Sequence, residues 1–192
     1  MCLANRKKWL RNVSVLLAAT LFVVMCIQDA GAFDGHRRGF TIGFGLGWGA
    51  VTHFSVVGKD FGETSNSLTA VLPIGYGLSD VDIIAFLPAP SFFKSEKLYG
   101  ARSMQGLWSI RWYHFLKPTG RSPFLSVGAG RVLFSSRYRD LSAYGPGVGA
   151  SVGYELFRHV TLDLEYFHGW TSEGDDKFSH DNLSFVLTAW AY

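Results

Sequence analysis

Histidine is the residue type in this sequence best suited to acid–base or metal chemistry. The chain of 192 residues has six histidines and two cysteines. The histidines are His36, His53, His114, His159, His168 and His180. None of them shows the spacing of a zinc or iron site, and Cys2 and Cys26 fall in a segment that we expect to be removed. We therefore expect neither a metal site nor a cofactor.

A glycine pattern, Gly45-x-Gly47-x-x-Ala50, superficially matches a dinucleotide-binding fingerprint. The glycines, however, continue at every second position from Gly43 to Gly49. That period describes one face of a β-strand and not a turn between a strand and a helix. We interpret these glycines as small residues that let a narrow barrel close.

The first 32 residues have the features of a secretory signal peptide. Basic residues precede an apolar run at residues 13–27, and Ala30-Gly31-Ala32 offers small residues for cleavage after Ala32. The run is shorter than the roughly 20 residues that a spanning helix needs. The expected mature chain, residues 33–192, carries 14 basic and 14 acidic residues, so nothing favours nucleic acid as a partner.

Beyond residue 33 the sequence alternates apolar and small or polar residues with a period of two, which predicts β-strands. The composition, 48% hydrophobic and 17% charged, excludes disorder and suits one compact domain. The predicted strands are 40–50, 68–78, 81–87, 104–115, 124–134, 144–156, 159–170 and 182–192. This makes eight strands of about ten residues, the length that suits a membrane-spanning strand.

The predicted connections alternate between short turns and four longer polar segments, 57–65, 88–103, 135–143 and 171–181. An even number of strands, a signal peptide and apolar outward faces together indicate an all-β, eight-stranded antiparallel up-and-down transmembrane β-barrel. We place it in the outer membrane of a Gram-negative bacterium. A soluble sandwich also alternates, but it does not line its outward faces with Leu, Ile, Val and Trp.

Charged residues on the inward faces need partners, because an unpaired buried charge is costly. Arg111 shares a face with Asp163 and Glu165, and Glu155 and Arg131 are further candidates for the same network. We expect a salt-bridged plug. It would leave no open pore, since side chains fill an eight-stranded lumen.

Aromatic residues near predicted strand ends are expected to form girdles at the membrane surfaces. They are Phe115, Phe124, Tyr144, Trp170 and Trp190. The last residue, Tyr192, with alternate residues behind it, is similar to the closing-strand signal read by the outer-membrane assembly machinery. That machinery is an expected partner, whereas nothing in the sequence indicates an oligomeric state.

His168 is the histidine whose predicted position, on a lipid-facing surface, suggests a functional role. It shares parity with Leu162, Leu164 and Tyr166, so it should face lipid near the end of its strand. A polar imidazole is expensive there unless it has a role. The alternative is an ordinary interfacial residue at a strand end.

The segment LEYFHGWTSEGDDKFSHDNLSFVLTAWAY, residues 164–192, resembles the end of the PagL-type lipid A 3-O-deacylases, also called acyloxyacyl hydrolases. Looser similarity extends back through FLSVGAGRVLF and VLPIGYGLSD. The resemblance implies an eight-stranded outer-membrane barrel with a lipid-facing Ser-His-acid triad. Its histidine corresponds to His168 and its acid falls near Asp181 or Asn182, but the serine position is occupied by Trp170.

The nearest hydroxyl on the same face is Ser172, four positions from His168 and about 13 Å away along a regular strand. Catalysis requires hydrogen-bond contact. Three functions therefore stay open: a non-catalytic deacylase-like barrel, which we favour, an active lipid A ester hydrolase using His168, a rearranged Ser172 and Asp181, and a barrel whose loops bind an external partner.

Lipid and lipopolysaccharide of the outer membrane are the expected molecular contacts in each case. Basic residues in the polar connections could contact phosphates. They are Lys94, Lys97, Arg102, Arg137 and Arg139.

Overall fold

The computed structural model describes residues 36–58, 62–97, 99–118, 120–137 and 141–192, and for residue 141 only the backbone. The expected signal peptide and its cleavage position lie outside these residues. Among the residues described, no helix is long and apolar enough to cross a bilayer. The strands are β1 (Gly39–Val56), β2 (Gly62–Val71), β3 (Ile74–Gly77), β4 (Asp82–Ser95), β5 (Ala101–Phe115), β6 (Pro123–Ser136), β7 (Leu141–Phe157), β8 (Val160–Glu173) and β9 (Asp176–Ala191).

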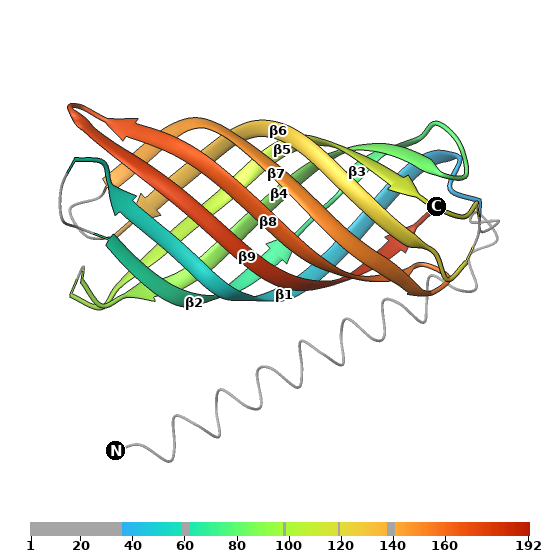
Figure 1. Ribbon diagram of the computed structural model, residues 1–192, viewed down its shortest axis with the longest axis horizontal. Helices are drawn as coiled ribbons and strands as arrows, with labels where there is room; N and C mark the ends of the chain where they lie inside the picture. The colour runs from blue at the N-terminus through green and yellow to red at the C-terminus, as the bar shows by residue number, and fades with distance from the viewer. Residues whose placement is uncertain (1–35, 59–61, 98, 119, 138–140) are drawn as a thin grey trace, which may run out of the picture. The chain divides into compact units, whose positions relative to one another are not determined.

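The strands form one closed antiparallel sheet, drawn as a barrel of tilted strands in Figure 1. Each strand from β4 onward pairs with the next, and β9 pairs back onto β1 along most of its length. Both β2 and β3 pair with β1 and β4, so they lie end to end in one position of the wall. The sheet therefore has eight positions, and the predicted eight-stranded antiparallel β-barrel is confirmed.

The predicted strand 68–78 is interrupted at its centre. Leu72 and Pro73 separate β2 from β3. Proline has no N–H to donate to a ladder, which confines it to strand ends, edges and bulges. The interruption leaves the hydrogen-bond order of the barrel unchanged, because β2 and β3 keep the same two neighbours.

Three of the four long polar connections expected from the sequence are largely strand, and the fourth, 57–65, is only partly so. β4 continues to Ser95 and β5 begins at Ala101, so most of 88–103 is paired, and the connection between β8 and β9 shrinks to residues 174–175. In 88–95 the apolar Phe92 and Phe93 are on opposite faces of β4, outward and inward. The hydropathy alternation therefore disappears from the sequence while backbone pairing goes on.

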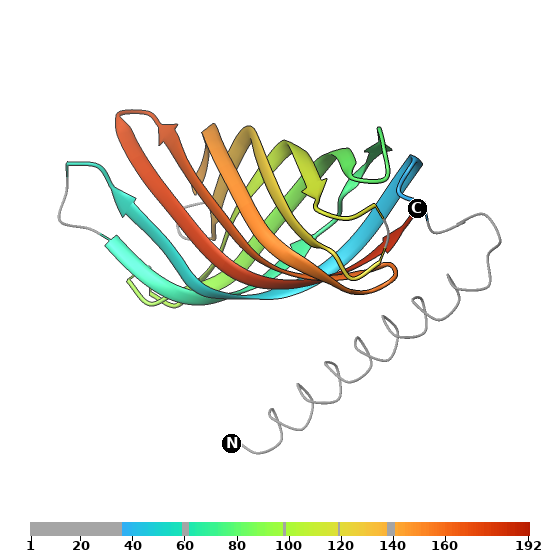
Figure 2. The same ribbon diagram turned by 45° about the vertical axis from the view of Figure 1, so that its right-hand side comes forward.

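We call the end that holds the start of β1 and the C-terminus the terminal rim, and the opposite end the distal rim. Figure 2 shows the C-terminus and the start of β1, in blue, at the same end. Between the rims, the outward side chains are predominantly apolar. Leu68, Ile110 and Val152 are each about 60% exposed. Exposed apolar surface on every strand of the wall is typical of a barrel in contact with lipid.

The inward glycines of β1 are placed where a side chain has no room. A Cβ atom on Gly45 would lie 2.5 Å from the hydroxyl of Thr188, and one on Gly49 would lie 1.9 Å from the hydroxyl of Ser67. Atoms do not approach that closely, so a side chain at either position would have to displace its neighbours on the adjacent strands. The interpretation of the glycines as small residues for a narrow barrel agrees with this geometry.

Side chains fill the lumen. Arg111 and Glu165 form a buried ion pair with 2.5 Å between nitrogen and oxygen, and Arg111 also donates to Ser126. Apolar clusters lie at both ends, with Phe54, Phe134 and Phe178 among the buried residues toward the distal rim. The predicted pairing of Arg111 with Glu165 is confirmed, whereas Asp163, the other acid expected in this plug, forms no ion pair with Arg111.

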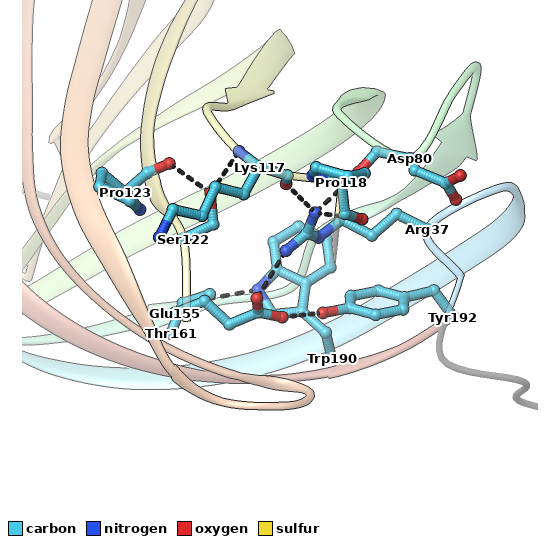
Figure 3. Close-up of polar contacts among 10 residues, drawn as sticks. All are labelled: Arg37, Asp80, Lys117, Pro118, Ser122, Pro123, Glu155, Thr161, Trp190 and Tyr192. Atoms are coloured by element: carbon cyan, nitrogen blue, oxygen red, sulfur yellow. Dashed lines mark hydrogen bonds and ion pairs between the residues drawn. The ribbon is translucent and has the colours of Figure 1, made fainter. Parts of the chain in front are cut away.

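A second charged group, which we call the terminal plug, closes the terminal rim (Figure 3). It consists of Arg37, Glu155 and Tyr192, all nearly fully buried. Arg37 pairs with Glu155 at 2.5 Å, and its guanidinium also donates to backbone carbonyls of two turns and stacks on the ring of Phe115. Burial, followed by the nearby Glu155 carboxylate, raises the pKa of the Tyr192 phenol, which stays protonated and donates to Glu155.

The sequence analysis named Glu155 and Arg131 as candidates for the Arg111 network, and neither joins it. Glu155 pairs with Arg37 instead, and Arg131 does not point inward. Arg131 lies on the outward face, with its guanidinium 5.0 Å from the ring centre of Tyr144. Alternation assigns a residue to a face only where it is regular, and the residue pattern of 124–134 does not fix which side chains point inward.

The expected aromatic girdle also needs correction. Phe115, Phe124 and Trp190 point into the lumen and are buried, whereas Tyr144 and Trp170 face outward. Tyr192 shares the inward face of β9 with Trp190. The lipid-facing residues of the last strand are instead Leu183, Phe185, Leu187 and their alternates.

Replacing Arg111 with leucine is expected to lower the free energy of unfolding by about 3 to 5 kcal/mol, because Glu165 would remain as an uncompensated buried charge. Urea titration of the barrel folded into lipid vesicles measures this. The double variant R111L/E165L removes both charges and should recover most of the loss. An R111L variant as stable as the wild type would contradict the buried pair.

The filled lumen is expected not to conduct ions appreciably, since paired charges and aromatic rings occupy it between the two rims. Purified, folded protein in planar bilayers should give the same baseline as protein-free bilayers. Stable single-channel currents of porin size would show that the lumen is open.

Candidate functional site: a lipid-facing histidine–aspartate pair

The structure brings together two of the three predicted site residues. His168 on β8 and Asp181 on β9 are directly opposite each other and face outward. His168 Nδ1 lies 2.8 Å from Asp181 Oδ1, and the side chains are 26% and 32% exposed. A carboxylate can only accept, so Nδ1 carries the proton and Nε2 is left as the basic nitrogen.

Two aromatic side chains complete the surroundings of the pair. The Tyr166 hydroxyl donates to the same oxygen, Asp181 Oδ1, at 2.7 Å. The Trp170 ring packs edge-on against the His168 imidazole with 4.4 Å between ring centres. Both aromatics are on β8, two positions before and after the histidine, which places all three side chains on the outward face.

The acid of the pair is Asp181 and not the alternative position, Asn182. Asn182 points into the lumen, where its amide oxygen accepts a hydrogen bond from Thr52. Successive residues of a strand face opposite sides, so only one of the two positions can meet an outward histidine.

Ser172, the third predicted site residue, is not brought to His168. Pairing between β8 and β9 runs without a register shift from Val160 to Glu173, so no bulge shortens the separation. Four residues of regular strand span about 13 Å. Thr171, the intervening hydroxyl, is buried inside the barrel and bonds to His180. Among the described residues, no hydroxyl is hydrogen bonded to His168 Nε2.

A second histidine, His53 on β1, lies on the other side of Asp181, as its direct partner across β9 and β1. Its Nδ1 contacts the Thr64 hydroxyl at 2.9 Å. Sequence analysis missed this neighbour because the register of β1 shifts between Gly49 and Val51, and a bulge reverses which residues face outward. Strict alternation from Phe40 would have placed His53 inside.

An equivalent pair stands at the terminal rim. His114 on β5 and Asp82 on β4 are opposite each other, with 2.9 Å between Nδ1 and Oδ1. Trp112, two positions from the histidine, donates to the same carboxylate oxygen at 3.0 Å and packs near the imidazole. This group therefore repeats the contacts of the His168 group: one carboxylate oxygen receives one imidazole and one aromatic donor.

A histidine oriented by a carboxylate is the base of a hydrolytic triad, but only when a nucleophile touches its second nitrogen. Here the Trp170 indole packs edge-on against the imidazole, and among the described residues no hydroxyl is hydrogen bonded to His168 Nε2. Among the described residues, no group of three or more His, Cys, Asp or Glu side chains could hold a metal ion. The arrangement can hold a proton and can accept or donate hydrogen bonds at the lipid surface.

The fold is that of the small outer-membrane β-barrel proteins. Neisserial surface protein A, NspA, has a TM-score of 0.53 and 14% identity, with 78% of this chain and 96% of that one covered. Ail of Yersinia pestis has a TM-score of 0.48 and 13% identity over 79% of this chain and 99% of that one. No protein-family model matches the chain, and no curated protein matches it. At such identities, the likeness concerns the fold alone.

Replacing Asp181 with asparagine should cost about 1 kcal/mol of stability, because the substitution weakens the charge-assisted hydrogen bonds from His168 and Tyr166. The matched change at the other rim, D82N, should cost a similar amount. Urea midpoints in lipid vesicles compare the two variants. A cost at Asp82 but a gain at Asp181 would show that the distal pair is not held for stability.

Proposed function

We propose that this chain is a non-catalytic outer-membrane barrel of deacylase-like descent, with a role at the lipopolysaccharide leaflet. The observation that carries the proposal is the Trp170 ring against His168, at the position where a triad needs its serine hydroxyl. The imidazole keeps its orienting carboxylate, yet its basic nitrogen has no alcohol to activate.

The outer-membrane placement is supported by three independent features. The first 32 residues read as a secretory signal. The wall presents apolar side chains outward on every strand. The fold matches that of a surface protein of a Gram-negative bacterium. We expect the terminal rim to face the periplasm and the distal rim to face the outside.

The likeness to the PagL-type deacylases rests on the segment around His168. The contact of His168 with Asp181 is the one that a triad of that kind requires, which supports common descent. The equivalent pair of Asp82 and His114 lies at the other lipid boundary, where no triad is expected. It therefore supports the view that such a contact can serve only to satisfy a histidine at the membrane surface.

The two other functions open at the start have less support. An active hydrolase through Ser172 needs a bulged strand end, and the register of β8 is continuous. A barrel that binds a partner through long loops needs such loops, and the distal connections have only two to five residues between strands.

Expression of the wild-type protein in a Gram-negative host is expected to leave lipid A acylation unchanged, as measured by mass spectrometry of extracted lipid A. Ser172→Ala should also change nothing. Trp170→Ser should release a small amount of a 3-hydroxy acyl chain, because it returns a hydroxyl two positions along the face on which Asp181 already orients His168.

Two controls sharpen the test. W170A removes the indole without supplying a hydroxyl, and W170S/H168A supplies the hydroxyl without the base; neither should release acyl chains. The proposal is wrong if the wild type releases a 3-hydroxy acyl chain and Ser172→Ala abolishes that release. Recovery of the protein in the soluble periplasmic fraction would refute the outer-membrane placement.

A further inference from the structure

Three basic residues from neighbouring strands lie in one row at the distal rim. Lys94 on β4 is directly opposite Arg102 on β5, and both side chains are exposed on the outward face. Arg137, directly after β6, donates its backbone N–H to the Arg102 carbonyl at 3.2 Å. The sequence could list these cations but could not show that they are adjacent. Arg139 lies outside the described residues.

The row stands where the outward surface changes from apolar to charged. Two positions nearer the middle of the barrel, Phe92 is opposite both Met104 and Leu68. Phe92 is 47% exposed and Leu68 59% exposed. A lipid whose chains cover Leu68 and Phe92 therefore has its headgroup at the level of Lys94 and Arg102.

Lys94 and Arg102 are like charges on directly opposed residues, an arrangement that destabilises a strand pair unless an anion lies between them. Among the described residues neither forms an ion pair with a carboxylate. The buried acid close by, Glu63, is already engaged: it accepts hydrogen bonds from the Ser95 hydroxyl at 2.5 Å and from the Glu96 amide at 2.6 Å. The other nearby acid, Glu96, is exposed, and it lines the same cavity as Glu63.

A surface cavity of about 1050 Å³ lies beside this row, lined in part by Asn66, Lys94, Lys97 and Arg102. It exists because β2 and β4 pair only at Leu68–Thr69 with Ser91–Phe92, so their distal ends leave space. The volume slightly exceeds the usual range of ligand pockets, about 300 to 1,000 Å³. It has room for a phosphorylated sugar.

We propose that the basic row and its cavity bind the phosphorylated headgroup of a lipid in the surrounding bilayer. The guanidinium groups of Arg102 and Arg137 can each engage two phosphate oxygens, and the Lys94 ammonium adds a point charge. The acyl chains lie over Leu68 and Phe92. The inference rests on the outer-membrane placement under the proposed function, and it does not involve His168.

The test uses full mature protein folded in a maltoside detergent, with calorimetric titration of bisphosphorylated lipid A and of the same lipid after removal of both phosphates. The wild type should bind the phosphorylated lipid at least about tenfold more tightly, the effect expected for a charge-assisted contact. K94Q/R102Q should lose this preference. K94R/R102K, which keeps the charges, should retain most of it.

A matched control removes two cations at the other rim, where Lys117 and Arg121 are also exposed. K117Q/R121Q should bind like the wild type, and heat-modifiable migration on gels confirms that every variant is folded. The inference is overturned if K94Q/R102Q keeps the phosphate preference or if the wild type has none. It is also overturned if inorganic phosphate or glucose 1-phosphate competes at the concentration of the lipid, since the site then binds soluble phosphate.

The outcome is separable from that of the proposed function. Acyl release by the wild type would refute the non-catalytic barrel and leave phosphate preference unaffected. Loss of phosphate preference would refute the headgroup site and leave the account of His168 and Trp170 unaffected.

Discussion

The structure depends on the closure of a sheet that has only eight positions. Such a barrel has no water-filled interior, so each inward side chain must be small, apolar or paired inside the wall. β1 meets this requirement with glycine, and Arg111 meets it with Glu165. The terminal plug meets it with Arg37 and Glu155, which also close one end of the lumen. Chemistry with an external molecule is therefore confined to the outward face and the rims.

On the outward face the surrounding lipid, and not the protein interior, makes an unpaired polar side chain costly. A histidine at the edge of the apolar surface needs a partner, and two histidines obtain one in the same way, from an aspartate on the neighbouring strand. The repetition matters for function, because a contact found at both rims cannot by itself indicate catalysis. What distinguishes a triad is the alcohol at the second imidazole nitrogen. Among the described residues His168 has no such hydroxyl, and the Trp170 ring packs against its imidazole.

Local alternation was enough to predict the barrel, the outward face around His168 and the pairing of Arg111 with Glu165. It failed where the answer depends on register between distant segments. The bulge after Gly49 turns His53 outward, and the fold of residues before β1 brings Arg37 to Glu155. Strand ends were also missed, because apolar residues there do not alternate regularly with polar ones, as the adjacent Phe92 and Phe93 show. The inward position of Tyr192 could not be read from a segment whose two faces are equally apolar.

The two outward features lie in different sectors of the wall. The histidine–aspartate pair is on β8 and β9 next to β1, whereas the basic row is on β4, β5 and the end of β6. Neighbouring strands are about 4.8 Å apart, so β6 and β8, the nearest strands of the two features on this side, are separated by about 10 Å around the wall. A change at one feature thus leaves the contacts of the other intact. Under the proposed function, a tryptophan in place of a serine beside His168 would remove hydrolysis without disturbing a headgroup contact on β4 and β5. A barrel of this kind could then keep an association with lipid after losing a reaction on it.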